Sequence, residues 1–426
     1  MNNRLFAYVA ASPTAYHACA HTADVLKNNG YTELFEADKW QIETGRGYFV
    51  RRNGSSLIAF RARETAKGFM IAASHCDSPC FKVKENAELA DSNYLRLSVE
   101  RYGGMLCSTW LDRPLSVAGR VIVRTESGVE SRLFNIGEPC AIIPNVAIHM
   151  NRQANDSMSY NAAVDMLPLI GSSERKGSFY ESVASAAGVD KGDIVSSDMY
   201  LYNPDKGIEW GDFISSPRLD DLQCAFASLT AFLGASDGES IPVLAIFDNE
   251  EVGSQTKQGA ASTFLYDTLQ RIIKAQGGDN DDYLRTVANS FMVSCDNAHA
   301  IHPNHPEYAD KNHNTVMNMG IVIKYNANQK YTSDGISAAL FKLICDKAGV
   351  PYQLYCNRAD MAGGGTLGNI ANTQVSLNTV DIGLAQLAMH SAFETAGARD
   401  TEYLIGALTV LYSSSVKACE NGVSLS

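Results

Sequence analysis

The chain has 426 residues, of which 45% are hydrophobic and 19% are charged, so two domains with packed interiors are expected. Its 35 basic and 47 acidic side chains give a net charge of -12, which argues against a nucleic acid or an anionic membrane surface as a partner. The first residues lack the basic and apolar regions of a signal peptide, and no stretch approaches about 18 uninterrupted apolar residues, so a cytoplasmic protein without membrane spans is expected.

The ten cysteines are scattered along the chain without a repeated spacing. This distribution predicts reduced side chains in the core rather than a disulfide framework. Cys76 and Cys80 lie close enough to suggest half of a zinc knuckle, but no second cysteine pair complements them. We therefore expect no metal ion at these two cysteines.

Residues 12–30 predict a helix near the start of the chain. Ser12 can cap its beginning, a proline follows in the first turn, and Gly30 can end it. His17 and His21 are one helical turn apart, which is a spacing that can bind a metal ion. No carboxylate accompanies them, so side-chain packing is the favoured interpretation of both histidines.

Three short apolar runs predict strands that are buried on both faces: 69–75, 241–247 and 291–296. Each run ends at or just before a residue that is acidic or able to bind a metal ion. Helical patterns lie between or after the runs, at about 219–235, 335–348 and 402–416. Buried strands that alternate with helices predict a layered α/β sandwich whose ligands gather beyond the carboxyl ends of the strands.

Between about residues 84 and 211 the pattern changes to shorter alternating segments, interrupted by Gly, Asn and Pro. This change predicts an inserted β-rich domain at 84–211 and a discontinuous catalytic domain formed by 1–83 and 212–426. The strands of the insertion would offer edges and apolar surface that a monomer has to cover. The insertion therefore predicts a homo-oligomer.

Two adjacent glutamates, Glu250 and Glu251, follow the apolar run 241–247 almost directly. Carboxylates at the end of a buried strand are partly desolvated, and each raises the free-energy cost of ionising the other. Two interpretations are open. Both side chains face solvent at the strand exit, or one binds a metal ion while the other acts on a water molecule. The second interpretation requires metal ligands elsewhere in the chain.

Suitable ligands occur at the ends of other predicted elements. His75 closes the first buried strand, and Asp77 is placed to accept its second ring N–H, as carboxylates beside metal-binding imidazoles do. Singly, the candidates have ordinary explanations, such as a helix cap for Asp220 or core packing for His390. Jointly they suit two divalent ions bridged by one carboxylate and one water. Outside the glutamate pair the candidates are His75, Asp220, Asp221, Asp296 and His390.

Seven segments, in chain order, resemble the aspartyl aminopeptidase family of dinuclear zinc peptidases, and the likeness extends from about Arg4 to the last helix. The segments are "SHCDSPCFKVK", "GGMLCSTWLDRPLSVAGRVIV", "SSPRLDDL", "DNEEVGS", "SCDNAHA", "GGGTLGNI" and "LAMHSAFETAG". The resemblance implies a bacterial member of this family. Its fold would be a three-layer α/β zinc-exopeptidase sandwich, with the β-rich insertion serving in dimerisation.

The resemblance also implies roles for single residues. Glu250 would be the general base, which takes a proton from a water shared by two zinc ions and passes it to the leaving amine. Asp77 would assist catalysis, and the Asp220–Asp221 peptide bond would be cis, as in related zinc exopeptidases. Mn²⁺ or Co²⁺ would suit the same two sites per subunit. The implied ligands are His75 and Asp296 on one zinc, Glu251 and His390 on the other, and Asp220 between them.

Two further residues would contact the substrate. His149, in the insertion, would reach from a partner subunit into the neighbouring active site, and Lys324 would pair with an acidic N-terminal side chain. Without the resemblance, both would be interpreted as solvent-facing strand residues. Relatives form tetrahedral dodecamers that enclose their active sites. Gly363 and Gly364 stand where eukaryotic relatives carry a bulkier pair, which leaves the side-chain preference open.

The expected function is the release of single residues, acidic or else neutral to hydrophobic, from the free N-termini of short peptides. Two alternatives stay open. One is another dinuclear amide hydrolase, such as a carboxypeptidase or a deacylase, because a bridged pair of ions does not specify the bond. The other is a catalytically silent assembly or cargo-binding protein that keeps the metal centre for stability.

Overall fold

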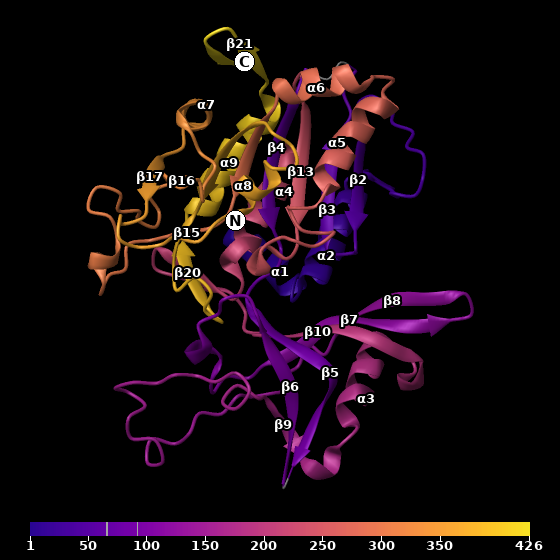
Figure 1. The fold of residues 1–426 in the computed structure, drawn as a ribbon, viewed down its shortest axis with the longest axis vertical. Coiled ribbons are helices and arrows are strands. Elements are labelled where there is room, and N and C mark those ends of the chain that lie inside the picture. The colour runs from indigo at the N-terminus through magenta and orange to yellow at the C-terminus, as the bar shows by residue number, and fades with distance from the viewer. Residues whose placement is uncertain (65–66, 92) are drawn as a thin grey trace.

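The computed structural model describes residues 1–64, 67–91 and 93–426. The chain forms two lobes, which Figure 1 shows one above the other. The larger, upper lobe is built on a nine-stranded sheet and the lower lobe on a six-stranded sheet. Among the helices in these described ranges, none is both long enough and apolar enough to cross a membrane.

The nine-stranded sheet has its most buried strands at its centre, where β13, β4 and β14 run parallel to one another. Every residue of these three strands is buried. Strands with helices on both sides need apolar residues on both faces, which explains their uninterrupted apolar runs. The strand order is β1 (Thr32–Leu34), β2 (Gly47–Arg52), β3 (Ser56–Arg61), β13 (Ile241–Phe247), β4 (Phe69–His75), β14 (Phe291–Cys295), β18 (Asn378–Gly383), β16 (Ile321–Tyr325) and β17 (Tyr352–Cys356).

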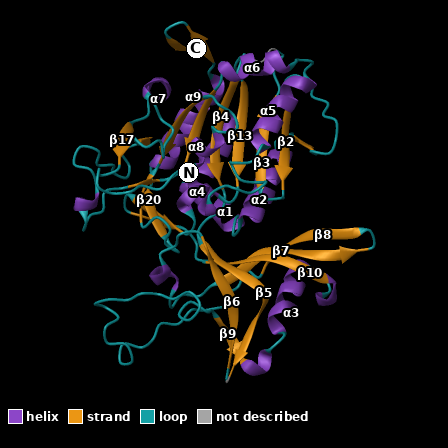
Figure 2. Ribbon diagram, viewed as in Figure 1, coloured by secondary structure: helices purple, strands orange, loops and turns teal. Residues whose placement is uncertain are grey.

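Helices cover both faces of this sheet, as Figure 2 shows. Successive side chains of β4 point to opposite faces, so Met70 and Ala72 join one apolar core while Phe69 and Ile71 join another. The upper lobe is therefore the three-layer α/β sandwich that the sequence predicts. The first core contains α1 (Asn2–Ala11), α2 (Ala15–Asn28), α4 (Leu219–Gly234), α7 (Gly335–Ala348) and α9 (Asp400–Ser413), and the second contains α5 (Phe264–Ala275), α6 (Asn280–Ala288) and α8 (Leu367–Ala371).

The lower lobe contains an antiparallel sheet and its own apolar core, against which α3 (Ser178–Ala187) packs. All its strands lie between Cys80 and Tyr202, and they include the alternating segments predicted in that part of the chain. The limits 84 and 211 of the inserted domain stay a prediction. The strand order is β8 (Gly128–Asn135), β7 (Ser116–Thr125), β10 (Ile194–Tyr202), β5 (Cys80–Asp91), β6 (Tyr94–Tyr102) and β9 (Leu169–Ser172).

Two smaller sheets complete the described fold. A five-stranded sheet joins two strands that directly follow the lower-lobe strands in the chain to three later strands, and beyond its strand β19 lies the turn that holds His390. A two-stranded hairpin ends the chain. The strands are β11 (Ile208–Trp210), β12 (Phe213–Ser216), β20 (Glu394–Gly397), β19 (Ala385–Leu387) and β15 (Ala298–His299), then β21 (Val416–Cys419) and β22 (Gly422–Leu425).

The structure corrects the limits of two predicted helices. The helix predicted to begin at Ser12 begins at Ala15, because Ser12 ends α1 with a non-helical backbone (φ -120°, ψ 56°), as residues before proline tend to adopt. The helix predicted at 402–416 begins at Asp400 and ends at Ser413. By contrast, α4 begins at the predicted residue and α7 has both predicted limits.

Candidate metal centre and active site

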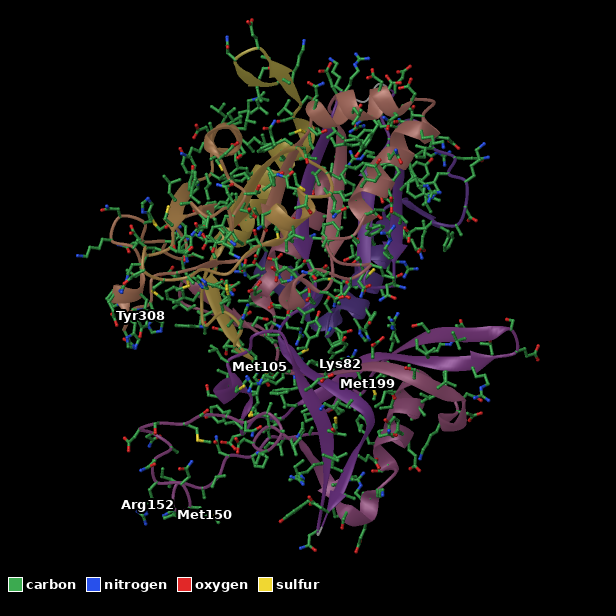
Figure 3. The ribbon with its side chains drawn as sticks, viewed as in Figure 1. Lys82, Met105, Met150, Arg152, Met199 and Tyr308 are labelled. Carbon is green, nitrogen blue, oxygen red and sulfur yellow. The ribbon has the colours of Figure 1, made fainter. Side chains whose placement is uncertain are left out.

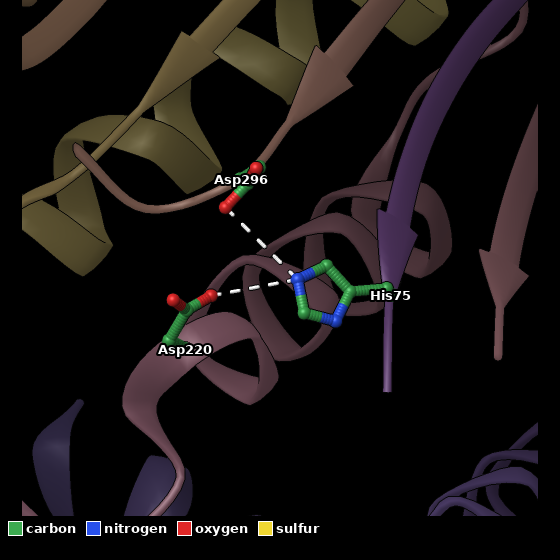
Figure 4. A group of neighbouring side chains, drawn as sticks. All are labelled: His75, Asp220 and Asp296. Carbon is green, nitrogen blue, oxygen red and sulfur yellow. Dashed lines mark ion pairs between the residues drawn. The ribbon is translucent and has the colours of Figure 1, made fainter. Parts of the chain in front are cut away.

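The polar residues of the site meet because three strands end at the same edge of the upper sheet. β4 lies between β13 and β14 and is parallel to both, and its last residue, His75, pairs with Phe247 at the end of β13. The residues that follow β13 and β14 therefore emerge beside His75. Figure 4 shows His75, Asp220 and Asp296 converging there from different elements.

The candidate ligand atoms form three overlapping groups among the described residues, of which one joins His75 to Glu250 and Glu251 and the other two contain Asp220. His75 Nε2 lies 3.4 Å from Asp220 Oδ1 and 4.0 Å from Asp296 Oδ1. His390 Nε2 lies 3.6 Å from Asp220 Oδ2 and 3.5 Å from Glu251 Oε2. Asp220 thus belongs to two of these groups, with one oxygen toward each imidazole. The atoms within each group lie within 4.8 Å of one another, which is close enough to share one ion.

The hydrogen bonds of both imidazoles favour metal binding through Nε2. His75 Nδ1 lies 3.0 Å from the main-chain oxygen of Asp77, and His390 Nδ1 lies 2.8 Å from that of Gly104. A carbonyl oxygen can only accept, so each Nδ1 carries the hydrogen. In the neutral ring the lone pair then belongs to Nε2, the nitrogen that faces the carboxylates.

The buried carboxylates of the cluster need positive charge nearby in order to ionise. Burial and the neighbouring carboxylates raise the pKa of Glu250 to about 8 and that of Asp296 to about 6. Burial and the charge of Asp220 raise the pKa of Glu251 well above its usual range. Burial alone would lower the pKa of His75, but the nearby carboxylates of Asp220 and Asp77 raise it well above its usual range. The centre therefore draws cations toward His75 Nε2.

The residues present fit zinc ions. Two ligands about 2.1 Å from a tetrahedral zinc lie roughly 3.4 Å apart, which matches the shorter distances between the imidazoles and the carboxylates. Asp220 Oδ1 and Glu251 Oε1 are buried and have no hydrogen-bond partner among the described residues. Buried acceptors without donors are costly unless a cation serves them. Imidazole and carboxylate are also ordinary zinc ligands.

Asp77 orients the turn that carries the two glutamates. Its carboxylate accepts the main-chain N–H groups of Glu250 and Glu251, both at 3.1 Å, and the hydroxyl of Tyr102 at 2.7 Å. The sequence predicts that this carboxylate accepts the second ring N–H of His75. The nearer acceptor is the main-chain oxygen of Asp77, whereas its Oδ1 lies 3.3 Å away.

Glu394 is a residue of the site that sequence reasoning missed. It is buried, and its carboxylate accepts the main-chain N–H groups of Asp220 at 3.1 Å and His390 at 2.7 Å. It thereby fixes the backbone of two candidate ligands. Its position in the segment "LAMHSAFETAG", four residues after His390, was the available signal. The Asp220–Asp221 peptide bond is cis, which confirms that prediction.

A pocket opens beside these ligands and contains Lys324. Lys324 is buried, so its interpretation as a solvent residue is wrong. Its Nζ donates to the main-chain oxygen of Asn297 at 2.8 Å and lies 3.8 Å from Asp296 Oδ2. Gly364 lies on the pocket wall and Gly363 in a pocket that adjoins it. Lys324 is thus beside the candidate metal ligands and already paired with one of them.

His149 lies apart from this cluster in the single chain. It is exposed in an irregular loop rather than on the expected strand. Figure 3 labels Met150 and Arg152, its near neighbours in sequence, at the outer end of the lower lobe. His149 belongs neither to the described groups of candidate ligands nor to the pocket beside them. Any role at an active site would therefore involve another subunit.

A layered α/β fold that gathers buried imidazoles and carboxylates at strand ends is typical of a metal-dependent hydrolase. The chain belongs to the family described as Aminopeptidase I zinc metalloprotease (M18), whose profile matches residues 8–412. It is therefore a metallo-aminopeptidase, and the resemblance found in the sequence is confirmed.

Individual relatives agree with this membership. A probable M18 family aminopeptidase 2 from Clostridium acetobutylicum is 45% identical over 414 residues, covering 94% of this chain and 96% of the relative. A protein of the same name from Ectopseudomonas mendocina is 40% identical over 422 residues, covering 96% and 97%. The solved structure of the S. cerevisiae mApe1 dodecamer has a TM-score of 0.84 at 27% identity, covering 96% of this chain and 95% of that chain.

Proposed function

We propose that this aminopeptidase releases single N-terminal residues from short peptides, with Glu250 as its general base. The observation that carries the base assignment is the difference between the twin glutamates. The side chain of Glu251 is 3% exposed and lies against His390, whereas that of Glu250 is 15% exposed and lines the pocket. A base has to reach water and substrate, so Glu250 suits that role and Glu251 suits that of a ligand.

We propose two zinc ions per subunit. His75 and Asp296 would hold one, Glu251 and His390 the other, and Asp220 both. When bound, zinc supplies a Lewis acid and lowers the pKa of water. Glu250 Oε2, 4.0 Å from His75 Nε2, would accept the proton and transfer it to the leaving amine. Asp77 would keep Glu250 aimed through the hydrogen bond to its main chain.

An N-terminal blocking test examines the aminopeptidase reaction on defined peptides. A short peptide with a free amine should lose its residues one at a time from the N-terminus, whereas its N-acetylated copy should resist cleavage. Mass spectrometry of the products follows both peptides over time. A panel of peptides with acidic, neutral or hydrophobic first residues identifies the preferred N-terminal side chain. The positive charge of Lys324 should favour the acidic ones. Trimming from the C-terminus would instead support a carboxypeptidase.

We propose that the region 84–211 is a dimerisation domain within a larger, cytoplasmic assembly, as the S. cerevisiae relative is a dodecamer. The loop of the lower lobe exposes apolar side chains that an assembly would cover, because Val146 is 53%, Ile148 47% and Met150 83% exposed. His149 lies among them. It would reach the active site of the partner, so that each site would need two chains.

Mixing of two variants tests whether His149 acts on the partner. Enzymes made only of His149→Ala or only of Glu250→Gln chains should have little activity. Co-expression of equal amounts should restore about a quarter of the wild-type activity, because half of randomly paired dimers are mixed and one of their two sites is complete. Steady-state assays of the purified mixtures measure this. Failure to exceed both parents would contradict a role in trans.

A further inference from the structure

The end of strand β6 enters the candidate metal centre from the lower lobe. Three consecutive residues there, Tyr102, Gly103 and Gly104, contact three different parts of the centre. Among the residues that the structure describes, the sheet to which β6 belongs carries neither a candidate ligand nor the candidate base. The six-stranded sheet can therefore affect the centre only through the residues that it positions there.

Tyr102 connects the two residues that shape the glutamate turn. Its hydroxyl donates to Asp77 Oδ2 at 2.7 Å and accepts from Asn249 Nδ2 at 2.7 Å. Asn249 precedes Glu250 and has a left-handed backbone (φ 61°). The Tyr102 hydroxyl therefore joins the residue that starts the turn to the carboxylate that caps its N–H groups. Hydrogen bonds to a carboxylate are among the stronger ones in proteins.

Gly103 allows the strand end to approach Glu251 closely. A Cβ atom at Gly103 would lie 3.1 Å from the Cβ of Glu251 and 3.4 Å from its Oε2. Gly103 also has a φ of +77°, a value that residues with a side chain rarely adopt. Both the available space and the backbone conformation thus favour glycine against this candidate ligand.

Gly104 and the residues after it hold the turn of His390. The main-chain oxygen of Gly104 accepts from His390 Nδ1 at 2.8 Å, and the N–H of Leu106 donates to the main-chain oxygen of His390 at 3.0 Å. Thr109 Oγ1 accepts the N–H of Ala392 at 2.9 Å. His390 has a positive φ of 68°, so these bonds stabilise an uncommon conformation.

We propose that Tyr102–Gly103–Gly104 is a positioning segment, through which the six-stranded sheet sets the orientation of the glutamate turn and of His390. The proposal rests on the assignment of Glu250, Glu251 and His390 in the proposed function. It gives the lower lobe a role in the active site of its own chain, in addition to any role in assembly. A substitution of Tyr102 tests the proposal, because phenylalanine lacks the hydroxyl but keeps the aromatic ring.

Tyr102→Phe should lower kcat about 10-fold while KM stays within about twofold, since mutation of a residue that orients a metal ligand typically costs about 10–100-fold in metal affinity or activity. Its affinity for zinc, measured by competition with a chelator, should fall about 10-fold because the turn of Glu251 loosens. The matched control is Tyr202→Phe. That tyrosine belongs to the same sheet, but its hydroxyl donates to Asn135 Oδ1 at 2.8 Å rather than to a residue of the centre. The control should match the wild type in both measurements.

Gly103→Ala provides a second, independent variant, because the added Cβ presses on Glu251 rather than removing a hydrogen bond. It should weaken zinc binding more than Tyr102→Phe does, while circular dichroism confirms that both proteins are folded. Wild-type turnover and zinc affinity in Tyr102→Phe would overturn the proposal. An active Glu250→Gln enzyme would instead overturn the base assignment, and a loss of zinc affinity in Tyr102→Phe would still support positioning of Glu251.

Discussion

Glu250→Gln should bind zinc as the wild type does and lose turnover by about 10²–10⁴-fold, the usual contribution of a general base. Glutamine has nearly the shape of glutamate but cannot take up the proton. The turn should persist, because Asp77 holds it through main-chain N–H groups that the substitution leaves intact. Steady-state kinetics and elemental analysis of the purified, dialysed protein measure the two effects.

The neighbouring glutamate offers a matched control for this prediction. Glu251→Gln makes the same chemical change one residue later, at a side chain that is buried against His390. It should lose zinc as well as activity, because a neutral amide oxygen is a weaker ligand than a carboxylate. If both variants lost zinc equally, or if Glu250→Gln kept its turnover, the division of roles between the twin glutamates would be wrong.

Asp220→Asn should lose both bound zinc and activity. Asp220 turns one carboxylate oxygen toward His75 Nε2 and the other toward His390 Nε2, and the substitution removes a negative charge between the two imidazoles. Loss of several kcal/mol of charge stabilisation corresponds to a fall in kcat/KM of about a thousandfold or more. Zinc content after dialysis and kinetics at saturating zinc distinguish loss of metal from loss of catalysis.

Asp221→Asn is the control for this variant. Asp221 is also buried, but it lies outside the described ligand groups, and its Oδ2 accepts the main-chain N–H of His75 at 3.1 Å. An asparagine oxygen can accept the same bond, so zinc should be retained. Full zinc occupancy in Asp220→Asn, or equal loss in both variants, would contradict the shared position of Asp220.

The elements whose pattern was local were predicted well from the sequence. The strands 69–75 and 241–247 were found at their observed limits, because burial on both faces leaves an uninterrupted apolar run. The helices α5 and α6 were missed. Ser12 was predicted to cap the start of a helix, but it caps the end of α1. Both kinds of error arise where a turn signal or a short amphipathic pattern has more than one interpretation.

His75, Asp220, Glu251 and Asp296 were found because each stands near the end of an element with a clear pattern, whereas His390 lies in an apolar segment and was assigned through the resemblance. Their grouping in the structure follows from the parallel register of β13, β4 and β14, which places His75 beside the ends of its neighbours. Glu394 and Tyr102 were missed because they act through main-chain N–H groups and through other side chains. Hydrogen bonds of this kind produce no characteristic spacing of residues that could be recognised in a sequence.

The sequence by itself determined the family, the layered fold and the identity of the chemically capable side chains, because these depend on residue type and on local periodicity. Only the tertiary structure decided which glutamate faces the pocket, which nitrogen of each imidazole is free, and that Asp77 holds the glutamate turn. It also decided that the lower lobe touches the centre through Tyr102–Gly103–Gly104. The physical reason is that orientation depends on hydrogen bonds between residues far apart in the chain, and these form only when the sheets have packed.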